Sequence, residues 1–137
     1  MTLYLDTSNL VKLYVDEPGS DEIRRLVQDA AAVATSSIAY AETRATFARR
    51  RRERVLTASR CKDAADAFDL DWARFVVIAL NDELAHAAGR LTDAHDVRGC
   101  DAIHLASFEW LLKRNPEDDV QFSCADDRLT RAAATFG

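Results

Sequence analysis

The sequence predicts an α/β fold in which helices cover both faces of a mainly parallel β-sheet. Short apolar runs alternate along the 137-residue chain with longer segments of helical periodicity, and this alternation is typical of strand–helix–strand units. No internal repeat or linker interrupts the pattern, and hydrophobic residues make up 48% of the chain. These observations indicate one domain, residues 1–137, with a core of its own.

The first half of the chain is expected to hold two strands and four helices. Ser20, followed by two acidic residues, is expected to cap the second helix. The third and fourth helices should each bury an apolar stripe, through Ile38, Ala41, Ala45 and Ala48 and through Cys61, Ala65, Phe68 and Trp72. The expected strands are 2–5 and 32–35, and the helices run over 7–15, from 20, from about 37 to 54 and from about 58.

The second half repeats this alternation. Asn81 is expected to cap a helix that buries Leu84, Ala88 and Leu91, and a second, largely apolar helix follows from about residue 100. A last helix covers 126–136, and the expected strands are 74–80 and 119–123.

An aspartate, Asp101, opens the most apolar helix of the chain. Apolar residues from Ala102 to Leu112 fall on every side of a 3.6-residue repeat, which indicates that protein surrounds most of this helix. A buried carboxylate costs roughly several kcal/mol unless an arginine, backbone N–H groups or a metal ion pairs with it.

Charge and cysteine content restrict the class of protein. The formal net charge of −5 argues against a generally basic nucleic-acid binder. The three cysteines are widely spaced and lack a CxxC motif, which is typical of reduced thiols in a cytoplasmic protein. No apolar run approaches the ~20 residues of a membrane span, and we see no signal peptide.

Four acidic residues from four separate segments are expected near one edge of the sheet. Asp6 and Asp126 follow the first and last expected strands, Glu42 lies about one turn into the third helix, and Asp101 opens the apolar helix. Ligand sites in parallel sheets lie outside the carboxyl ends of the strands. Taken singly, each acid has a simpler role: Asp6 and Asp126 as helix caps, Glu42 as a solvated residue and Asp101 as a partner of the helix dipole.

If these acids converge, their charges must be neutralised. Oxygen ligands select a hard cation, so Mg²⁺ or Mn²⁺ fits better than zinc. Such a cation activates water and stabilises the leaving oxygen of a phosphodiester. The sequence therefore favours a metal site that would also pair with Asp101.

The segments that carry these acids resemble the PIN domain and, more narrowly, the VapC-type toxins of bacterial toxin–antitoxin pairs. The match covers nearly the whole chain in the right order, through YLDTSNLVKLYVDEPGS, ATSSIAYAETRATFARR, RGCDAIHLA and FSCADDRL. The resemblance implies a three-layer α/β/α sandwich with a four- to five-stranded sheet. It also implies a Mg²⁺- or Mn²⁺-dependent endoribonuclease, a homodimer neutralised by a VapB-like antitoxin.

The resemblance assigns roles to individual residues. Asp6, Glu42 and Asp101 would form the core metal set and Asp126 would complete it. Metal-bound water would attack RNA in line and leave 5′-phosphate and 3′-hydroxyl ends. Relatives often add a fifth strand after the last helix, whereas this chain ends at TFG.

Several neighbours of the acids carry secondary expectations. Thr7 and Ser8 match a hydroxyl pair that orients the first acid or contacts phosphate. The family often has a hydroxyl two residues before the last acid, where this chain has Cys124 preceded by Ser123. Asp127 is a less favoured substitute for Asp126.

A run of arginines ends the Glu42 helix. Arg49, Arg50, Arg51 and Arg52 are expected either to track the RNA backbone or to form a solvated face favoured near a helix C-terminus. An acidic antitoxin segment could also dock there. His104 is expected to be a core or supporting residue rather than a ligand, and the large aromatic residues are expected in the core or a dimer interface: Phe68, Trp72, Phe108 and Trp110.

Two other functions were weighed. A haloacid-dehalogenase-type phosphohydrolase also starts with an acid after its first strand, but needs a second aspartate two residues later, where this chain has Ser8. A catalytically silent PIN-like module that only binds a partner would be favoured by a missing acid, and all four are present.

Overall fold

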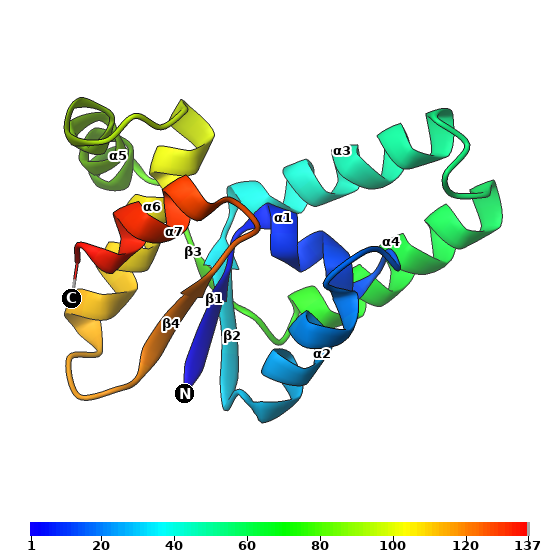
Figure 1. The fold of residues 1–137 in the computed structure, drawn as a ribbon, viewed down its shortest axis with the longest axis horizontal. Coiled ribbons are helices and arrows are strands. Elements are labelled where there is room, and N and C mark those ends of the chain that lie inside the picture. Colours follow the sequence, from blue (N-terminus) through cyan, green and yellow to red (C-terminus); the bar gives the residue numbers. More distant parts are fainter. Residues whose placement is uncertain (137) are drawn as a thin grey trace.

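The computed structural model describes residues 1–136 and consists of a parallel sheet between two layers of helices (Figure 1). The strands are β1 (Thr2–Leu5), β2 (Ala32–Ser36), β3 (Val76–Ile78) and β4 (Val120–Ser123). Their order is β3-β2-β1-β4, and every neighbouring pair is parallel. The expected α/β sandwich is confirmed, with four strands and no fifth strand within residues 1–136.

Within residues 1–136, seven α-helices and one short 3₁₀ helix connect and cover these strands. Figure 1 shows α1 to α4 on one side of the sheet and α5 to α7 on the other. The helices are α1 (Thr7–Leu10), the 3₁₀ helix η1 (Val11–Leu13), α2 (Ser20–Asp29), α3 (Ile38–Arg52), α4 (Ala58–Trp72), α5 (Asp82–Ala94), α6 (Gly99–Arg114) and α7 (Asp127–Ala134).

Strand β1 divides the core into two halves. Successive side chains of a strand point to opposite faces, so Leu3 and Leu5 pack with Phe47 and Phe68 beneath α1–α4. Tyr4 lies on the other face, in a cluster that includes Phe108 of α6. The sheet is therefore buried on both sides, which explains why its strands read as short apolar runs.

The first and last strands of the chain, β1 and β4, are neighbours in the sheet, with β4 as an outer strand. Leu5 pairs with Ser123 in register, and the Asp6 N–H donates to the Ser123 carbonyl at 3.1 Å. The segments after β1 and β4 consequently leave the sheet side by side, at its carboxyl edge.

The expected cap at Ser20 is wrong by one residue. Gly19 occupies the cap position with a φ of 93°, a left-handed conformation that favours glycine. Ser20 is the first residue inside α2, and its Oγ accepts from the Glu17 N–H and donates to the Val15 carbonyl. Its hydroxyl therefore holds the preceding turn.

The buried face of α3 also differs from the expected stripe. Ala39, Thr43 and Phe47 are buried, whereas Ala41 and Ala45 are exposed. Alanine is accommodated on either face of a helix, so the position of Phe47 decides which face turns inward.

The remaining elements follow the sequence closely. The Asn81 side chain accepts from the Leu84 N–H at 2.8 Å and caps α5, as expected. Phe68 is fully buried between α3 and α4. Strand β3 is shorter than the expected 74–80 at both ends, and its last residue, Ile78, lies opposite Ser36, where β2 ends. None of the helices described in residues 1–136 is long and apolar enough to cross a membrane.

Candidate active site

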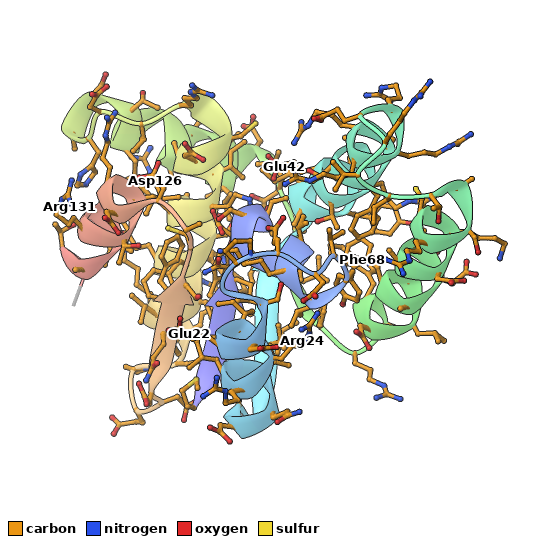
Figure 2. All side chains as sticks on the ribbon, turned by 45° about the vertical axis from the view of Figure 1, so that its right-hand side comes forward. Glu22, Arg24, Glu42, Phe68, Asp126 and Arg131 are labelled. Atoms are coloured by element: carbon orange, nitrogen blue, oxygen red, sulfur yellow. The ribbon has the colours of Figure 1, made fainter. Side chains whose placement is uncertain are left out.

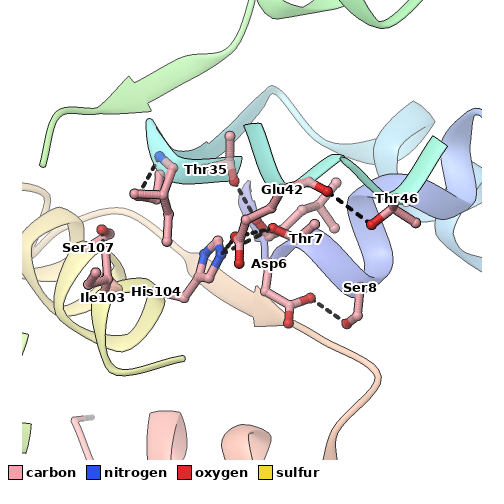
Figure 3. Close-up of polar contacts among 12 residues, drawn as sticks. Asp6, Thr7, Ser8, Thr35, Glu42, Thr46, Ile103, His104 and Ser107 are labelled. Carbon is pink, nitrogen blue, oxygen red and sulfur yellow. Dashed lines mark hydrogen bonds and ion pairs between the residues drawn. The ribbon is translucent and has the colours of Figure 1, made fainter. Parts of the chain in front are cut away.

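The four acids expected at the site lie around the carboxyl edge of the sheet. Asp6 is the first residue after β1, and Asp126 lies three residues after the end of β4. Glu42 is in the second turn of α3 and Asp101 in the first turn of α6. Figure 2 shows Glu42 and Asp126 on this side of the molecule, and Figure 3 shows Asp6 close to Glu42.

Electrostatic effects show that these carboxylates share one environment. Burial raises the pKa of Asp6, which is only 6% exposed, and the nearby Asp101 raises it further. Burial also raises the pKa of Asp101, with added repulsion from Asp126 and Glu42. Because ionising these acids together is unfavourable, the region favours a compensating positive charge.

One oxygen of Asp6 is held by the residues that follow it. Asp6 Oδ1 accepts from the Ser8 hydroxyl at 2.7 Å and from the Asn9 N–H at 3.2 Å. Asp6 is thus the N-cap of α1, so the simpler role considered for it is also present. Within residues 1–136, no hydrogen bond reaches its second carboxylate oxygen.

Glu42 and Asp126 are held in the same one-sided way. Glu42 Oε1 accepts from the Thr7 hydroxyl at 2.6 Å and lies 2.9 Å from Nε2 of His104. Asp126 Oδ1 accepts from the N–H groups of Arg128 and Leu129 and caps α7. In the part of the chain that the structure describes, Glu42 Oε2 and Asp126 Oδ2 receive no hydrogen bond.

The hydrogen bonds of Glu42 outweigh its burial. Burial alone would raise the pKa of this carboxyl, but the hydrogen bonds from His104 and Thr7 lower it below its ordinary value. Glu42 is therefore stabilised as an anion, unlike Asp6 and Asp101.

The donor set fits a hard divalent cation. Among residues 1–136, each of the four carboxylates has at least one oxygen that receives no hydrogen bond, and carboxylate oxygen is the ligand type that Mg²⁺ and Mn²⁺ prefer. Among residues 1–136, no three His, Cys, Asp or Glu side chains already converge closely enough to hold one ion. The acids gather around a region, and they do not form a closed cage.

A cavity of about 470 Å³ opens beside two of the acids. Asp101 and Asp126 line it together with two arginines, Arg98 and Arg128. Arg128 pairs with Asp96 at 3.2 Å. The lining is Asp96, Val97, Arg98, Asp101, Asp126, Arg128 and Leu129. This cavity therefore offers both carboxylates and guanidinium groups to a ligand.

The hydroxyl residues differ in how close they come to the acids. Ser8 Oγ donates to Asp6 and also accepts from the Ala125 N–H at 3.0 Å. Within residues 1–136, the Ser123 hydroxyl makes no hydrogen bond to the four acids; its Oγ accepts from the Asn9 side chain at 2.8 Å. The Cys124 thiol donates to the Asp126 carbonyl. Thr7 and Ser8 thus hydrogen-bond directly to the carboxylates of Glu42 and Asp6, whereas the Ser123 hydroxyl is linked to the Asp6 carboxylate only through Asn9.

The α3 arginines lie apart from the acids. They begin seven residues beyond Glu42, about 10 Å along the helix axis. Arg50 pairs with Glu17 at 3.1 Å and Arg49 with Glu53 at 3.5 Å. Arg51 and Arg52 line a separate cavity of about 730 Å³ between α3 and α4, together with Arg44, Phe47, Ala48, Ala58, Cys61, Lys62, Ala65 and Asp66.

Three polar residues near the site, Tyr4, Asn9 and Lys12, make contacts that the sequence does not predict. Tyr4 lies 2.8 Å from Nδ1 of His104. Asn9 is buried and its Oδ1 accepts from Lys12 Nζ at 2.9 Å. The partners of Tyr4 and of the Asn9 amide lie 100 and 114 residues away, so no local sequence pattern reveals these contacts.

Comparison with known proteins agrees with this geometry. Residues 3–109 match the family described as PIN domain. Ribonucleases VapC45 and VapC49 of Mycobacterium tuberculosis are each 38% identical over 105 residues, which is 77% of this chain and 73% of theirs. Ribonuclease VapC46 of the same organism is 30% identical over 135 residues, 98% of this chain and 92% of its own.

Solved structures with the same fold are more distant in sequence. VapC20 of M. tuberculosis, described as a sarcin–ricin loop cleaving toxin, has a TM-score of 0.68 at 20% identity and covers 95% of this chain and 94% of its own. FitAcB of Neisseria gonorrhoeae has a TM-score of 0.66 at 14% identity, with 96% and 93% covered. By sequence and by fold, the chain belongs to the PIN-domain family and is similar within it to the VapC-type ribonucleases.

Proposed function

We propose that this chain is a metal-dependent endoribonuclease that acts as the toxin of a toxin–antitoxin pair. The relatives named ribonuclease VapC support the class of reaction. One observation of the site carries the proposal: four carboxylates from four segments gather at the carboxyl edge of the sheet, and three of them are held through one oxygen with the other left free.

Asp6, Glu42 and Asp101 would hold the cation, and Asp126 would complete the set. When bound, Mg²⁺ or Mn²⁺ supplies the positive charge that makes water a better nucleophile and stabilises the leaving oxygen of a phosphodiester. The chain itself orients the carboxylates: Ser8 and the α1 N-terminus fix Asp6, and Thr7 fixes Glu42. No side chain needs to serve as a nucleophile.

RNA would reach the acids past two groups of arginines. Arg98 and Arg128 stand beside Asp101 and Asp126 in one cavity, where guanidinium groups suit phosphate. Of the α3 arginines, Arg51 and Arg52 form no ion pair in the described part of the chain, and they line the groove between α3 and α4. Arg49 and Arg50 are paired with acids and contribute less positive field.

A protein partner and a second copy of the chain complete the proposal. One solved structure of similar fold is of VapBC2 from Rickettsia felis bound to a promoter DNA fragment, which supports a VapB-like antitoxin as partner. The homodimer has support in the exposed apolar residues Val76 and Leu80 at the β3 end of the sheet. The three free cysteines support the cytoplasm as the place of action.

The haloacid-dehalogenase alternative loses its basis, because the chain belongs to the PIN-domain family. The silent binding module is the outcome that the following experiment would reveal.

The test is RNA cleavage by the purified protein, freed of any antitoxin. Wild type is incubated with a panel of total RNAs in Mg²⁺, in Mn²⁺ and in EDTA, beside Asp6→Asn and Asp101→Asn. The matched control is Asp29→Asn, an exposed carboxylate before β2 at the opposite edge of the sheet.

We expect discrete cuts with 5′-phosphate ends in wild type and in Asp29→Asn, and none in EDTA or in the two site variants. Cleavage that persists in EDTA or in both site variants would show that the acids are not the catalytic site. A folded wild type that binds no Mn²⁺ by calorimetry and cuts no RNA would identify a silent module.

A further inference from the structure

A buried histidine stands directly behind Glu42. His104 lies on α6, one turn after Asp101, and is 2% exposed. Its Nε2 is 2.9 Å from Glu42 Oε1 and 3.3 Å from the Thr7 hydroxyl, and its Nδ1 is 2.8 Å from the Tyr4 hydroxyl. Figure 3 shows the imidazole pointing from α6 toward Glu42 and Thr7.

Both ring nitrogens therefore have a partner, and the partners fix which nitrogen carries the proton. A carboxylate only accepts hydrogen bonds, whereas a tyrosine hydroxyl can donate as well as accept. The arrangement that satisfies all three groups is a Tyr4 hydroxyl donating to Nδ1 and an Nε2–H donating to Glu42 Oε1. Such a ring is held at both ends.

Tyr4 is itself held by packing. It is fully buried on β1, two residues before Asp6. Its ring stacks on that of Phe122, with the ring centroids 5.5 Å apart, and contacts that of Phe108, with the centroids 5.9 Å apart. The chain of contacts thus runs from the rigid core of the sheet to a carboxylate at its edge.

Glu42 depends on this support more than the other acids. Its side chain is long and half-buried, and its carboxylate receives no backbone N–H within residues 1–136, unlike those of Asp6 and Asp126. His104 and Thr7 both bind Oε1, so together they set the direction in which Oε2 faces.

We infer that Tyr4 and His104 are positioning residues, which orient the Glu42 carboxylate so that its free oxygen faces a divalent cation. This inference rests on the proposed function, because it assigns Glu42 to the cation. It goes further because it assigns two buried side chains, the Tyr4 phenol and the His104 imidazole, to the support of the cation site, although neither would touch the ion.

The test measures cation affinity as well as RNA cleavage. Mn²⁺ binding is followed by titration calorimetry for wild type, His104→Leu, His104→Gln and Tyr4→Phe, with thermal unfolding to establish that each is folded. Tyr14→Phe is the matched control, because it removes a phenol hydroxyl that donates to a carboxylate, Asp71, in the other half of the core.

Partners of this kind typically change metal affinity by about 10- to 100-fold when they are removed. We expect His104→Leu to weaken Mn²⁺ binding by about this factor and Tyr4→Phe by less. His104→Gln should recover part of the loss, because its amide N–H can still reach Glu42. Tyr14→Phe should bind Mn²⁺ like wild type.

The inference would be overturned by a folded His104→Leu with wild-type Mn²⁺ affinity, or by a Gln variant that binds no better than the Leu variant. If wild type binds Mn²⁺ and Asp101→Asn does not, such a result removes the inference and leaves the proposed function standing. If wild type binds no cation, both fall.

A second readout needs neither cation nor RNA. Nitrogen-15 spectra of the imidazole in the metal-free protein report which nitrogen is protonated. We expect a proton on Nε2, with a resonance that shifts in Glu42→Gln. A ring protonated at Nδ1 alone would overturn the inference, because it would have no proton to donate to Glu42.

Discussion

Ser8 joins Asp6 to the segment that leads to Asp126. Its hydroxyl donates to Asp6 Oδ1 at 2.7 Å and accepts from the Ala125 N–H at 3.0 Å. One side chain thus connects the segments that follow the first and last strands, and it sets the spacing between two of the acids.

Ser8→Ala should therefore loosen both acids at once. We expect Mn²⁺ affinity and RNA cleavage to fall about 10-fold, the lower end of the range for residues that orient metal ligands. Calorimetry and cleavage rates measure the two effects. Ser59→Ala, on the exposed face of α4, is the control, and equal behaviour of the two variants would contradict the role given to Ser8.

Asp101→Asn should stabilise the metal-free protein while it abolishes cleavage. The pKa of Asp101 is raised in the folded state by burial and by Asp126 and Glu42, so its ionised form is disfavoured there. We expect the Tm at pH 7 without cations to rise by roughly 2–4 °C. A lower Tm would show that the Asp101 charge stabilises the fold.

The same shift predicts a pH dependence. A carboxyl whose pKa is raised on folding contributes stability below its unfolded value, near 3.8, and loses it as the pH rises through the folded value. The Tm difference between Asp101→Asn and wild type should therefore shrink as the pH falls from 7 toward 3.8. A difference that is independent of pH would contradict the proposed repulsion.

Divalent cations should stabilise wild type, because the proposed cation site exists only in the folded chain. At a free Mn²⁺ concentration 100 times the Kd, the gain is about 2.7 kcal/mol. Differential scanning calorimetry with Mn²⁺ and with EDTA measures it. We expect no gain in Asp6→Asn, and an equal gain in that variant would locate the ion elsewhere.

The α3 arginines should divide into two pairs by function. Replacing Arg51 and Arg52 with Gln should weaken RNA binding and reduce the slope of log Kd against log salt by roughly 1 or more. Arg50→Gln should mainly lower the Tm, because Arg50 pairs with Glu17 at 3.1 Å. Filter binding at several salt concentrations tests this, and an unchanged slope in the double variant would remove these residues from the RNA path.

The aromatic cluster between α3 and α4 should be structural. Phe68 is fully buried and its ring contacts those of Tyr14, Tyr40, Phe47 and Trp72. Phe68→Ala should cost about 3–5 kcal/mol of unfolding free energy. Leu70→Ala, two residues along the same helix at 74% exposure, should change it by less than about 0.5 kcal/mol. Urea denaturation compares the two.

The sequence predicts the strands and the places of the acids because these depend on local patterns. Asp6 and Asp126 follow apolar runs, and a carboxylate at such a position is visible in the sequence. The buried face expected for α3 is wrong because Ala41 and Ala45 carry little information about burial, and the large apolar side chain of Phe47 decides which face turns inward.

Contacts between distant segments explain what the sequence could not provide. His104 is buried, as expected of a core or supporting residue. Its partners, Tyr4 and Glu42, could not be predicted because they lie 100 and 62 residues away in the sequence. Likewise, the pairing of Arg50 with Glu17 depends on how α3 packs over the turn before α2. Such pairs become visible only when the chain has folded.

The pairing of β1 with β4 has a consequence for synthesis of the protein. Asp6 is synthesised well before Ser123, whose carbonyl accepts its backbone N–H, and before Ala125, to which its carboxylate is linked through Ser8. A growing chain that lacks β4 can pair β1 with β2 but leaves the other side of β1 without a partner, and it holds only part of the acid cluster. Nuclease activity should therefore appear only when this region has been fully translated. A cell that makes the protein has time to produce an antitoxin before the active form exists.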